Sequence, residues 1–217
     1  MRIVDLSKRL RPGKEKRRLE IEEFVYPPGE LMHYINLESH IGTHVEAPSH
    51  YIPARYGKAA KDISRLTLEK FFGEAVFVDL SSSRKKQKIR PEDLDVKISQ
   101  GDIVLIGNSP YEDADRPQLS EKLIKWLVEK RIKMIGVDDS VRPGPRPKEG
   151  GRAKRLEDMS DHDLFLSSEI PIIEQLTNLN SLSKRRFFFI GFPLLIQGLD
   201  SSPIRAVALE DFSVSEM

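Results

Sequence analysis

Eight short runs of β-branched and aromatic residues recur along this chain of 217 residues and constrain its fold more than any other feature. Runs of this length and composition, bounded by turn residues, predict β-strands. We expect strands at Ile3–Leu6, Ile21–Tyr26, Met32–Ser39, Ala75–Leu80, Ile103–Gly107, Lys133–Val137, Phe187–Phe192 and Ile204–Leu209.

Helical signals are fewer. Leu119–Arg131 has apolar residues at helical spacing with Ser120 as a suitable N-cap, Pro91–Leu94 predicts a short turn of helix, and Ser160–Leu166 predicts another. Ser81–Lys88 and Val141–Arg155 are polar or rich in Pro and Gly, so we expect loops there. Strands come first and mixed strands and helices follow, which favours an α plus β fold. The length suits one domain over residues 1–217.

The composition excludes several classes of function. Thirty-five Lys plus Arg nearly cancel 34 Asp plus Glu, so the formal charge of +1 gives no general case for nucleic-acid or membrane-surface binding. The absence of Cys excludes disulfides, thiolate nucleophiles and Cys-type zinc sites. No run approaches the ~20 apolar residues that span a bilayer, and the first residues do not resemble a signal peptide. We therefore expect a cytoplasmic protein with a small-molecule partner.

Three of the five histidines fall within eleven residues, in His40-Ile-Gly-Thr-His44-Val-Glu46-Ala-Pro-Ser-His50. The offsets of His44, Glu46 and His50 from His40 are 4, 6 and 10, and even offsets share one face of an extended strand. Gly42-Thr43 and Pro48 argue against a helix. Pro48 also indicates that strand pairing ends before His50, which would then face the same point from a bend.

Two imidazoles and one carboxylate are a common ligand set for catalytic Zn²⁺, and they also suit Mn²⁺ or Fe²⁺. His40, His44 and Glu46 are therefore candidate metal ligands that leave a position open for water or substrate. A set of histidines that merely hydrogen-bond in a core is the alternative, and it explains the shared face poorly. His33 stands alone in an apolar run, where that ordinary core role is favoured. By composition alone, His162 is a surface helix residue and Glu174 a strand-end carboxylate.

The segment from His40 to His50 resembles the HxGTHxDxPxH signature of the cyclase family of metal-dependent hydrolases, which includes kynurenine formamidase and isatin hydrolase. It departs from the signature at Glu46, where the family usually has Asp. The resemblance covers nearly the whole chain. It extends to Asp5-Leu-Ser, Gly73-Glu-Ala-Val-Phe-Val-Asp-Leu-Ser, Ile135-Gly-Val-Asp-Asp-Ser, Ile172-Ile-Glu-Gln-Leu-Thr-Asn-Leu and Ser202-Pro-Ile-Arg-Ala-Val-Ala.

The resemblance implies a swivelling β/β/α domain, assembled as a homodimer or homotetramer whose partner subunit helps to wall the pocket. It implies that His40, His44 and Glu46 hold a first metal ion and that His50 is the proton shuttle or general base. A later His and a Glu twelve residues on complete a second metal site in the family, and His162 and Glu174 have that spacing. One or two Zn²⁺ ions per chain are implied, with Mn²⁺ or Fe²⁺ as alternatives.

The implied reaction is hydrolysis of an amide-like bond, in an aryl formamide or a cyclic amide, by metal-activated water. A lactone or ester hydrolase of the same family is one alternative. A catalytically silent protein that binds a metal or a small ligand is another. Glu46 favours the silent protein, because its extra methylene changes any bridging geometry, whereas the presence of His50 argues against it. Basic residues of Arg142–Arg155 would attract a substrate carboxylate or simply face solvent.

Overall fold

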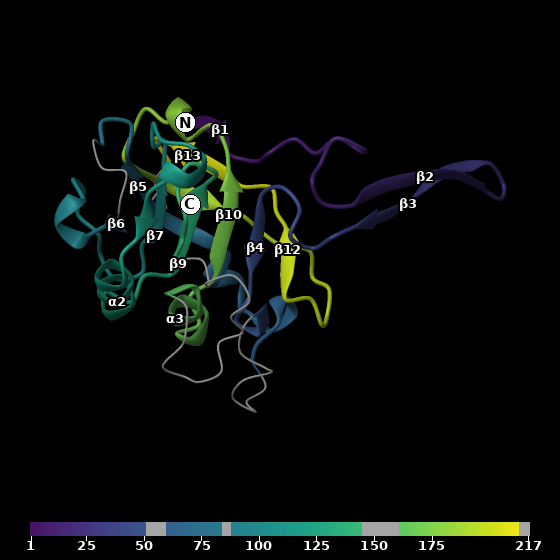
Figure 1. Cartoon of the computed structure of the whole chain (residues 1–217). Coiled ribbons are helices and arrows are strands. Elements are labelled where there is room, and N and C mark those ends of the chain that lie inside the picture. Colours follow the sequence, from purple (N-terminus) through teal and green to yellow (C-terminus); the bar gives the residue numbers. More distant parts are fainter. Residues whose placement is uncertain (51–59, 84–87, 145–160, 213–217) are drawn as a thin grey trace.

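The computed structural model of the chain describes residues 1–50, 60–83, 88–144 and 161–212. Nine strands form a mixed sheet in the order β1-β13-β11-β5-β7-β9-β10-β4-β12 (Figure 1). Four neighbours in the centre, β5, β7, β9 and β10, run parallel, and the outer strands pair antiparallel. The strands are β1 Arg2–Asp5, β4 His44–Glu46, β5 Phe72–Asp79, β7 Ile103–Gly107, β9 Met134–Asp138, β10 Ile172–Leu176, β11 Arg186–Ile190, β12 Ser201–Pro203 and β13 Val207–Glu210.

The remaining elements are short, apart from one hairpin. Strands β2 Leu19–Tyr26 and β3 Glu30–Leu37 pair with each other, as do β6 Lys88–Ile89 and β8 Gln118–Leu119. The α-helices in the described ranges are α2 Glu121–Glu129 and α3 Asp161–Ser167. The 3-10 helices are η1 Pro48–His50, η2 Ile63–Arg65, η3 Leu68–Phe71, η4 Pro91–Asp93, η5 Asp113–Asp115 and η7 Leu179–Ser181.

Both faces of the sheet are buried, and neighbouring residues of one strand pack into different layers. On β10, Ile172 joins the cluster that contains Leu123 of α2 and Phe165 of α3, whereas Ile173 joins the opposite cluster with Phe71. This alternation follows from the pleat of a strand. Burial on both faces explains why the central strands are continuous apolar runs.

The fold class predicted from the sequence is confirmed: the chain is a mixed α/β protein. Each of the eight predicted strands has a counterpart, although Ile204–Leu209 shortens to β13. The predicted N-cap of α2 is also present, because the Ser120 hydroxyl accepts a hydrogen bond from the Leu123 N–H at 3.1 Å. Most of the predicted Val141–Arg155 loop lies outside the described residues. Within the described ranges, no helix is long and apolar enough to cross a membrane.

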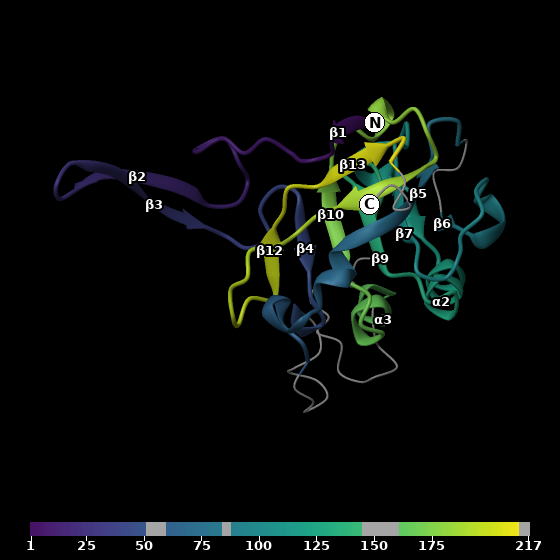
Figure 2. The ribbon, with the colours of Figure 1, turned by 180° about the vertical axis from the view of Figure 1, so that it is seen from behind.

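The β2–β3 hairpin projects away from the body of the molecule, as both views show (Figures 1 and 2). Residues Leu19 to Tyr26 pair in register with Leu37 to Glu30. His33 lies on this hairpin, with its Nε2 3.6 Å from Glu23 Oε2, and its side chain is 41% exposed. The expectation of a core histidine at position 33 is therefore wrong, because the apolar run around it belongs to an exposed strand.

A buried carboxylate on β13 ties this strand to the edge strand β1 and to the residues before β11. Glu210 accepts hydrogen bonds from Arg2 Nη1 at 2.6 Å and from the N–H groups of Ser183 and Lys184 at 2.7 and 2.8 Å. Its side chain is fully buried. Burial alone raises the pKa of Glu210, but the hydrogen bonds from Lys184, Ser183 and Arg2 outweigh burial and hold the pKa below its ordinary value.

Replacing this carboxylate is expected to weaken the fold in a pH-dependent way. In Glu210→Gln, the side-chain NH₂ group would face N–H groups that now donate to the carboxylate, and two donors cannot pair. We therefore expect the free energy of unfolding at neutral pH to fall by about 1–3 kcal/mol. A lowered carboxyl pKa contributes stability above the unfolded-state pKa, and that stability is lost as the pH falls through the folded-state pKa. Urea unfolding at a series of pH values should show the gap between the two proteins narrowing in acid. A gap that is constant with pH would contradict this account.

Candidate metal centre

The segment from His40 to His50 is not one extended strand, which corrects the expectation from the even offsets. Only His44–Glu46 form a strand, β4, while His40 lies in a turn before it and His50 in η1 after it. Gly42 has a positive φ of +59°, and a Cβ there would lie 2.5 Å from Leu10 Cδ2. A glycine is favoured at this position because the backbone conformation strains a residue with a Cβ and the Leu10 side chain would have to move to make room for one.

Thr43 fixes this turn to three other segments. Its hydroxyl donates to the Gln175 carbonyl oxygen at 2.6 Å and accepts from the Lys8 N–H at 2.8 Å. Its carbonyl oxygen accepts from the Ile204 N–H at 3.0 Å. The turn is therefore held by the N-terminal segment, by β10 and by the residues that follow β12.

The predicted ligands converge on one oxygen of Glu46. Glu46 Oε1 lies 3.0 Å from His40 Nδ1, 3.7 Å from His44 Nε2 and 3.7 Å from His50 Nε2. His44 and Glu46 are buried and share one face of β4, as the alternation of a strand predicts. The structure thus brings together His40, His44, Glu46 and His50, although a turn and a 3-10 helix deliver the first and the last.

His44 is set to offer one ring nitrogen to a ligand. Its Nδ1–H donates to the Gly42 carbonyl oxygen at 2.7 Å, which leaves the lone pair on Nε2. This Nε2 is buried and makes no hydrogen bond with any residue that the structure describes. An unsatisfied buried polar atom costs about 1–3 kcal/mol, so the arrangement favours a group that accepts its lone pair.

The donor set fits a divalent metal ion. His40, His44 and Glu46 each offer one atom, and these three atoms lie within 4.8 Å of one another. That spacing is compatible with one ion at the usual ~2.0–2.2 Å from nitrogen and oxygen ligands. Hydrogen bonding of the second ring nitrogen of a ligand, as Gly42 provides for His44, is typical of metal sites.

Glu174 lies at the same cluster, and a β-bulge helps to place it there. It pairs with His44 in the β10–β4 register, and its Oε2 lies 4.0 Å from His44 Nε2. The register between β10 and β9 shifts between Ile173 and Leu176, and Gln175 has a φ of +57°. Bulges of this kind redirect side chains beside functional sites. His162 belongs to α3, which packs beside η1, but its side chain lies outside the described residues.

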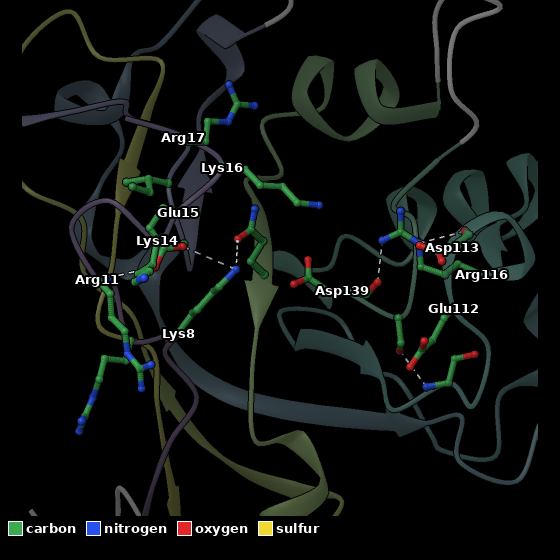
Figure 3. Close-up of a pocket in the computed structure, with 16 residues that line it drawn as sticks. Lys8, Arg11, Lys14, Glu15, Lys16, Arg17, Glu112, Asp113, Arg116 and Asp139 are labelled. Carbon is green, nitrogen blue, oxygen red and sulfur yellow. Dashed lines mark hydrogen bonds and ion pairs between the residues drawn. The ribbon is translucent and has the colours of Figure 1, made fainter. Parts of the chain in front are cut away.

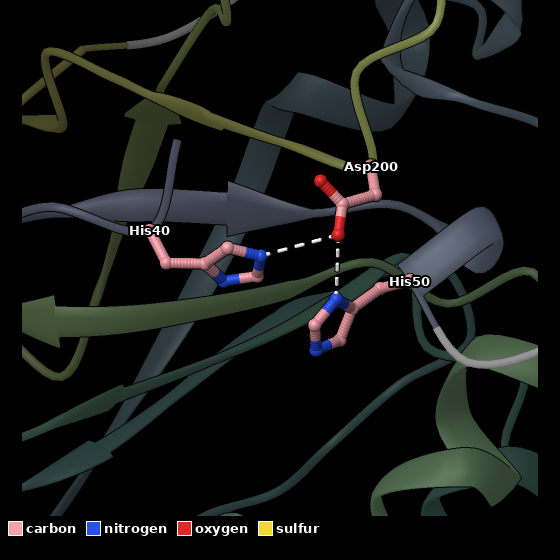
Figure 4. Close-up of side chains that lie close together, drawn as sticks. All are labelled: His40, His50 and Asp200. Atoms are coloured by element: carbon pink, nitrogen blue, oxygen red, sulfur yellow. Dashed lines mark hydrogen bonds and ion pairs between the residues drawn. The ribbon is translucent and has the colours of Figure 1, made fainter. Parts of the chain in front are cut away.

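Sequence reasoning missed Asp200, which touches two of the histidines (Figure 4). Asp200 Oδ2 lies 2.8 Å from His50 Nδ1 and 3.2 Å from His40 Nε2. The residue directly precedes β12, whose Ser201 pairs with Glu46, and its carbonyl oxygen accepts from the Ala47 N–H at 2.8 Å. Its one sequence signal was an acidic residue next to the familial segment that starts at Ser202.

The charges in the cluster shift two pKa values. Burial lowers the pKa of His40, but the hydrogen bond and charge of Glu46, followed by those of Asp200, outweigh burial and raise the pKa above its usual value. Burial raises the pKa of Asp200, whereas the contacts with His50 and His40 lower it, with a net decrease. A metal ion at His40 must displace a proton there, so we expect metal affinity to weaken in acid.

A basic cleft of about 760 Å³ lies beside the backbone of the candidate metal centre, at Gly42 and Gln175 (Figure 3). Its lining includes Gly42 and Gln175, which are close neighbours in sequence of His44 and Glu174. One wall is strongly basic and the facing loops carry acidic groups and serines. The charged and serine residues of the lining are Lys8, Arg9, Arg11, Lys14, Lys16, Arg17, Arg116, Glu15, Glu112, Asp113, Asp139, Ser109 and Ser140.

The turn at Gly42 can be tested by adding a single methyl group. Gly42→Ala should lower the free energy of unfolding by about 1–3 kcal/mol from the positive φ, and by more from the contact with Leu10. Gly13→Ala is the matched control, since Gly13 has a φ of +70° and open space around a Cβ. Denaturant unfolding of both variants isolates the contact, and equal losses would show that Leu10 does not restrict the turn.

The chain is similar to proteins of a known family. The Cyclase family model, described as "Putative cyclase", matches residues 4–140. A kynurenine formamidase of Salinibacter ruber is 30% identical over 181 residues, covering 80% of this chain and 77% of that protein. An uncharacterized protein of Methanocaldococcus jannaschii is 26% identical and covers 96% of this chain and 100% of its own length.

Similar structures have been solved as well. Isatin hydrolase A of Ralstonia solanacearum superposes with a TM-score of 0.75 at 22% identity, over 96% of this chain and 92% of that one. This likeness shows a common fold. Since the family model covers more than half of the residues and the Salinibacter relative covers most of them, the chain belongs to the Cyclase family.

Proposed function

We propose that this protein is a metal-dependent hydrolase of an amide-like bond, in an aryl formamide or a cyclic amide. His40, His44 and Glu46 hold the metal in this proposal, and His50 handles the proton. The observation that carries the proposal is the buried His44 Nε2, which faces Glu46 Oε1 without a hydrogen bond to any described residue. Kinship with proteins named kynurenine formamidase supports the choice of bond.

A divalent cation held by these ligands would supply Lewis-acid chemistry, because it would lower the pKa of a water toward neutrality and polarise a carbonyl group. His50 then accepts the proton of the attacking water at Nε2, because its Nδ1 is committed to Asp200 at 2.8 Å. The same imidazole returns this proton to the leaving nitrogen. The C–N bond breaks, a C–O bond forms, and one water is consumed.

The proposed ion is Zn²⁺, with Mn²⁺ and Fe²⁺ as alternatives that the same ligands suit. A second ion would be held by Glu174 and His162, together with Glu46. The proximity of Glu174 to His44 supports this arrangement. Metal counting by elemental analysis, on protein purified without chelators, separates one ion per chain from two.

A panel of an aryl formamide, a cyclic amide and a lactone of similar size tests the bond that is cleaved. We expect turnover of an amide-like substrate that depends on added metal. Turnover of the lactone alone would favour the ester-hydrolase alternative. Stoichiometric metal binding without turnover of any of the three would favour the silent binding protein.

Two histidine variants test the division of roles. His44→Ala should lose metal and activity together, because it removes a buried ligand. His50→Ala should keep the metal and lose about 10²–10⁴-fold in kcat, the usual size of general acid–base help. His33→Ala is the matched control, since His33 is exposed on the hairpin and should change neither property. An active and fully metallated His44→Ala protein would contradict the site.

We also propose that the protein is a homodimer or homotetramer assembled through the β2–β3 hairpin. One face of the hairpin gathers Ile21, Val25, Leu31 and Ile35, which are 49%, 68%, 59% and 61% exposed. A two-stranded ribbon is marginally stable by itself in water, and apolar side chains on it favour a partner.

The charges favour a second copy of the chain as that partner. Residues 19–37 carry four Glu and no Lys or Arg, whereas residues 8–18 carry seven Lys or Arg and one Glu. The hairpin of one copy thus complements the basic segment of another.

Val25→Lys combined with Ile35→Lys should convert the oligomer to a monomer in light scattering coupled to size exclusion. Each change buries a charge in the proposed interface. Lys122→Glu on the exposed face of α2 serves as a control that should leave the mass unchanged. A monomeric wild-type protein at high micromolar concentration would overturn the proposed assembly.

A further inference from the structure

One carboxylate oxygen joins the two histidines that have different roles in the proposed site. Asp200 Oδ2 lies 3.2 Å from His40 Nε2 and 2.8 Å from His50 Nδ1 (Figure 4). The two imidazole rings are tilted by 49° to each other, with centroids 4.4 Å apart. An ionised carboxylate only accepts hydrogen bonds, so both ring nitrogens must carry their hydrogen on the side of Asp200.

For His40, this contact determines which nitrogen faces the metal ligands. With one hydrogen held on Nε2 by Asp200, Nδ1 is the nitrogen that faces Glu46 Oε1 at 3.0 Å, and the proton that it shares with Glu46 is the one a metal ion would replace. A carboxylate behind a metal-bound histidine fixes the orientation of the ring and raises its basicity as a ligand. Asp200 therefore has the same relation to His40 that the Gly42 carbonyl has to His44.

For His50, the same contact determines which nitrogen is the base. With the hydrogen on Nδ1, the basic lone pair lies on Nε2, which points toward Glu46 Oε1 at 3.7 Å. A base whose second nitrogen is held by a third group is the arrangement that recurs in hydrolytic sites. Without the carboxylate, the imidazole can adopt the other tautomer and present an N–H where a base is needed.

His40, His50 and Asp200 could in principle hold a metal ion themselves, because their donor atoms also lie within 4.8 Å of one another. Both candidate groups contain hydrogen bonds, since His40 Nδ1 lies 3.0 Å from Glu46 Oε1 and Asp200 Oδ2 lies 2.8 and 3.2 Å from its two histidines, so these distances do not decide between them. The buried His44 Nε2 is the atom left without a hydrogen-bond partner among the described residues. The geometry therefore favours the ion beside His44 and a supporting role for Asp200.

We propose that Asp200 is a positioning residue that sets the tautomers of His40 and His50 together, so that one carboxylate prepares both a metal ligand and the base. The inference rests on the proposed hydrolase function for its catalytic consequence. Its structural part, the tautomer of His50, holds with or without metal.

The experiment compares Asp200→Asn with Asp200→Glu and with a control on a neighbouring segment that contacts the same loop. Asp62→Asn is that control, because Asp62 accepts a hydrogen bond from the Gly198 N–H at 2.8 Å and is not within hydrogen-bond distance of either histidine. Long-range ¹H–¹⁵N spectra report the tautomer of each ring, and five histidines per chain keep the assignment simple. Zinc affinity, kcat and KM are measured on the same proteins.

Asp200→Asn should shift His50 of the metal-free protein away from the Nδ1–H tautomer. It should lower kcat by about 10²–10⁴-fold with KM changed less than threefold. Zinc affinity should weaken by about 10–100-fold, the usual effect of losing the partner of a ligand. Asp200→Glu keeps the carboxylate and should recover at least tenfold in kcat, while Asp62→Asn should stay within about threefold of wild type.

An unchanged His50 tautomer in Asp200→Asn, with kcat within threefold of wild type, would overturn the inference. Equal losses in Asp62→Asn would assign the effect to the loop and would also overturn it. If the wild-type protein neither bound metal nor hydrolysed the panel, the proposed function would fail. The tautomer of His50 in the metal-free protein would still decide the role of Asp200.

Discussion

The buried carboxylate of Glu46 is the group on which the rest of the site depends. A carboxylate with 4% of its side chain exposed is stable only when charge or hydrogen bonds compensate it. His40 provides that compensation at 3.0 Å from Glu46 Oε1, and His44 and His50 lie 3.7 Å from the same oxygen. A metal ion would replace the proton that His40 shares with Glu46. Glu46 therefore holds its carboxylate at the centre of the cluster.

The topology of the sheet explains why this cluster forms only in the complete fold. Strand β4 has three residues and lies between β10 and β12, both antiparallel to it. Its neighbours bring Glu174 and Asp200 beside a segment that is more than 100 residues away in sequence. Thr43 then ties the turn before β4 to Lys8, Gln175 and Ile204. Long-range strand pairing and hydrogen bonds therefore fix the proposed ligands, the Asp200 carboxylate and the turn before β4. This limits the local flexibility of each segment.

The sequence predicted β5, β7, β9 and β11 well because they are apolar runs of five to eight residues, but its eight strands did not include β10, the fourth parallel strand of the centre. It predicted an extended segment from His40 to Glu46, of which only the three residues of β4 are a strand, and it did not predict the three-residue β12. The shared face of His44 and Glu46 followed correctly from alternation. His40 and His50 reach the cluster by a turn and a 3-10 helix, which even offsets could not indicate. Asp200 was beyond sequence reasoning, since 160 residues separate it from His40 and only the β4–β12 pairing joins them.

The position of the ion is the most direct test of this account. A crystal of the zinc-loaded protein, measured on both sides of the zinc absorption edge, locates the metal without reference to activity. We expect an anomalous peak about 2.0–2.2 Å from His40 Nδ1, His44 Nε2 and Glu46 Oε1, with Asp200 still hydrogen-bonded to His40 and His50. A peak among His40 Nε2, His50 and Asp200, or no peak at the cluster in zinc-saturated crystals, would contradict it.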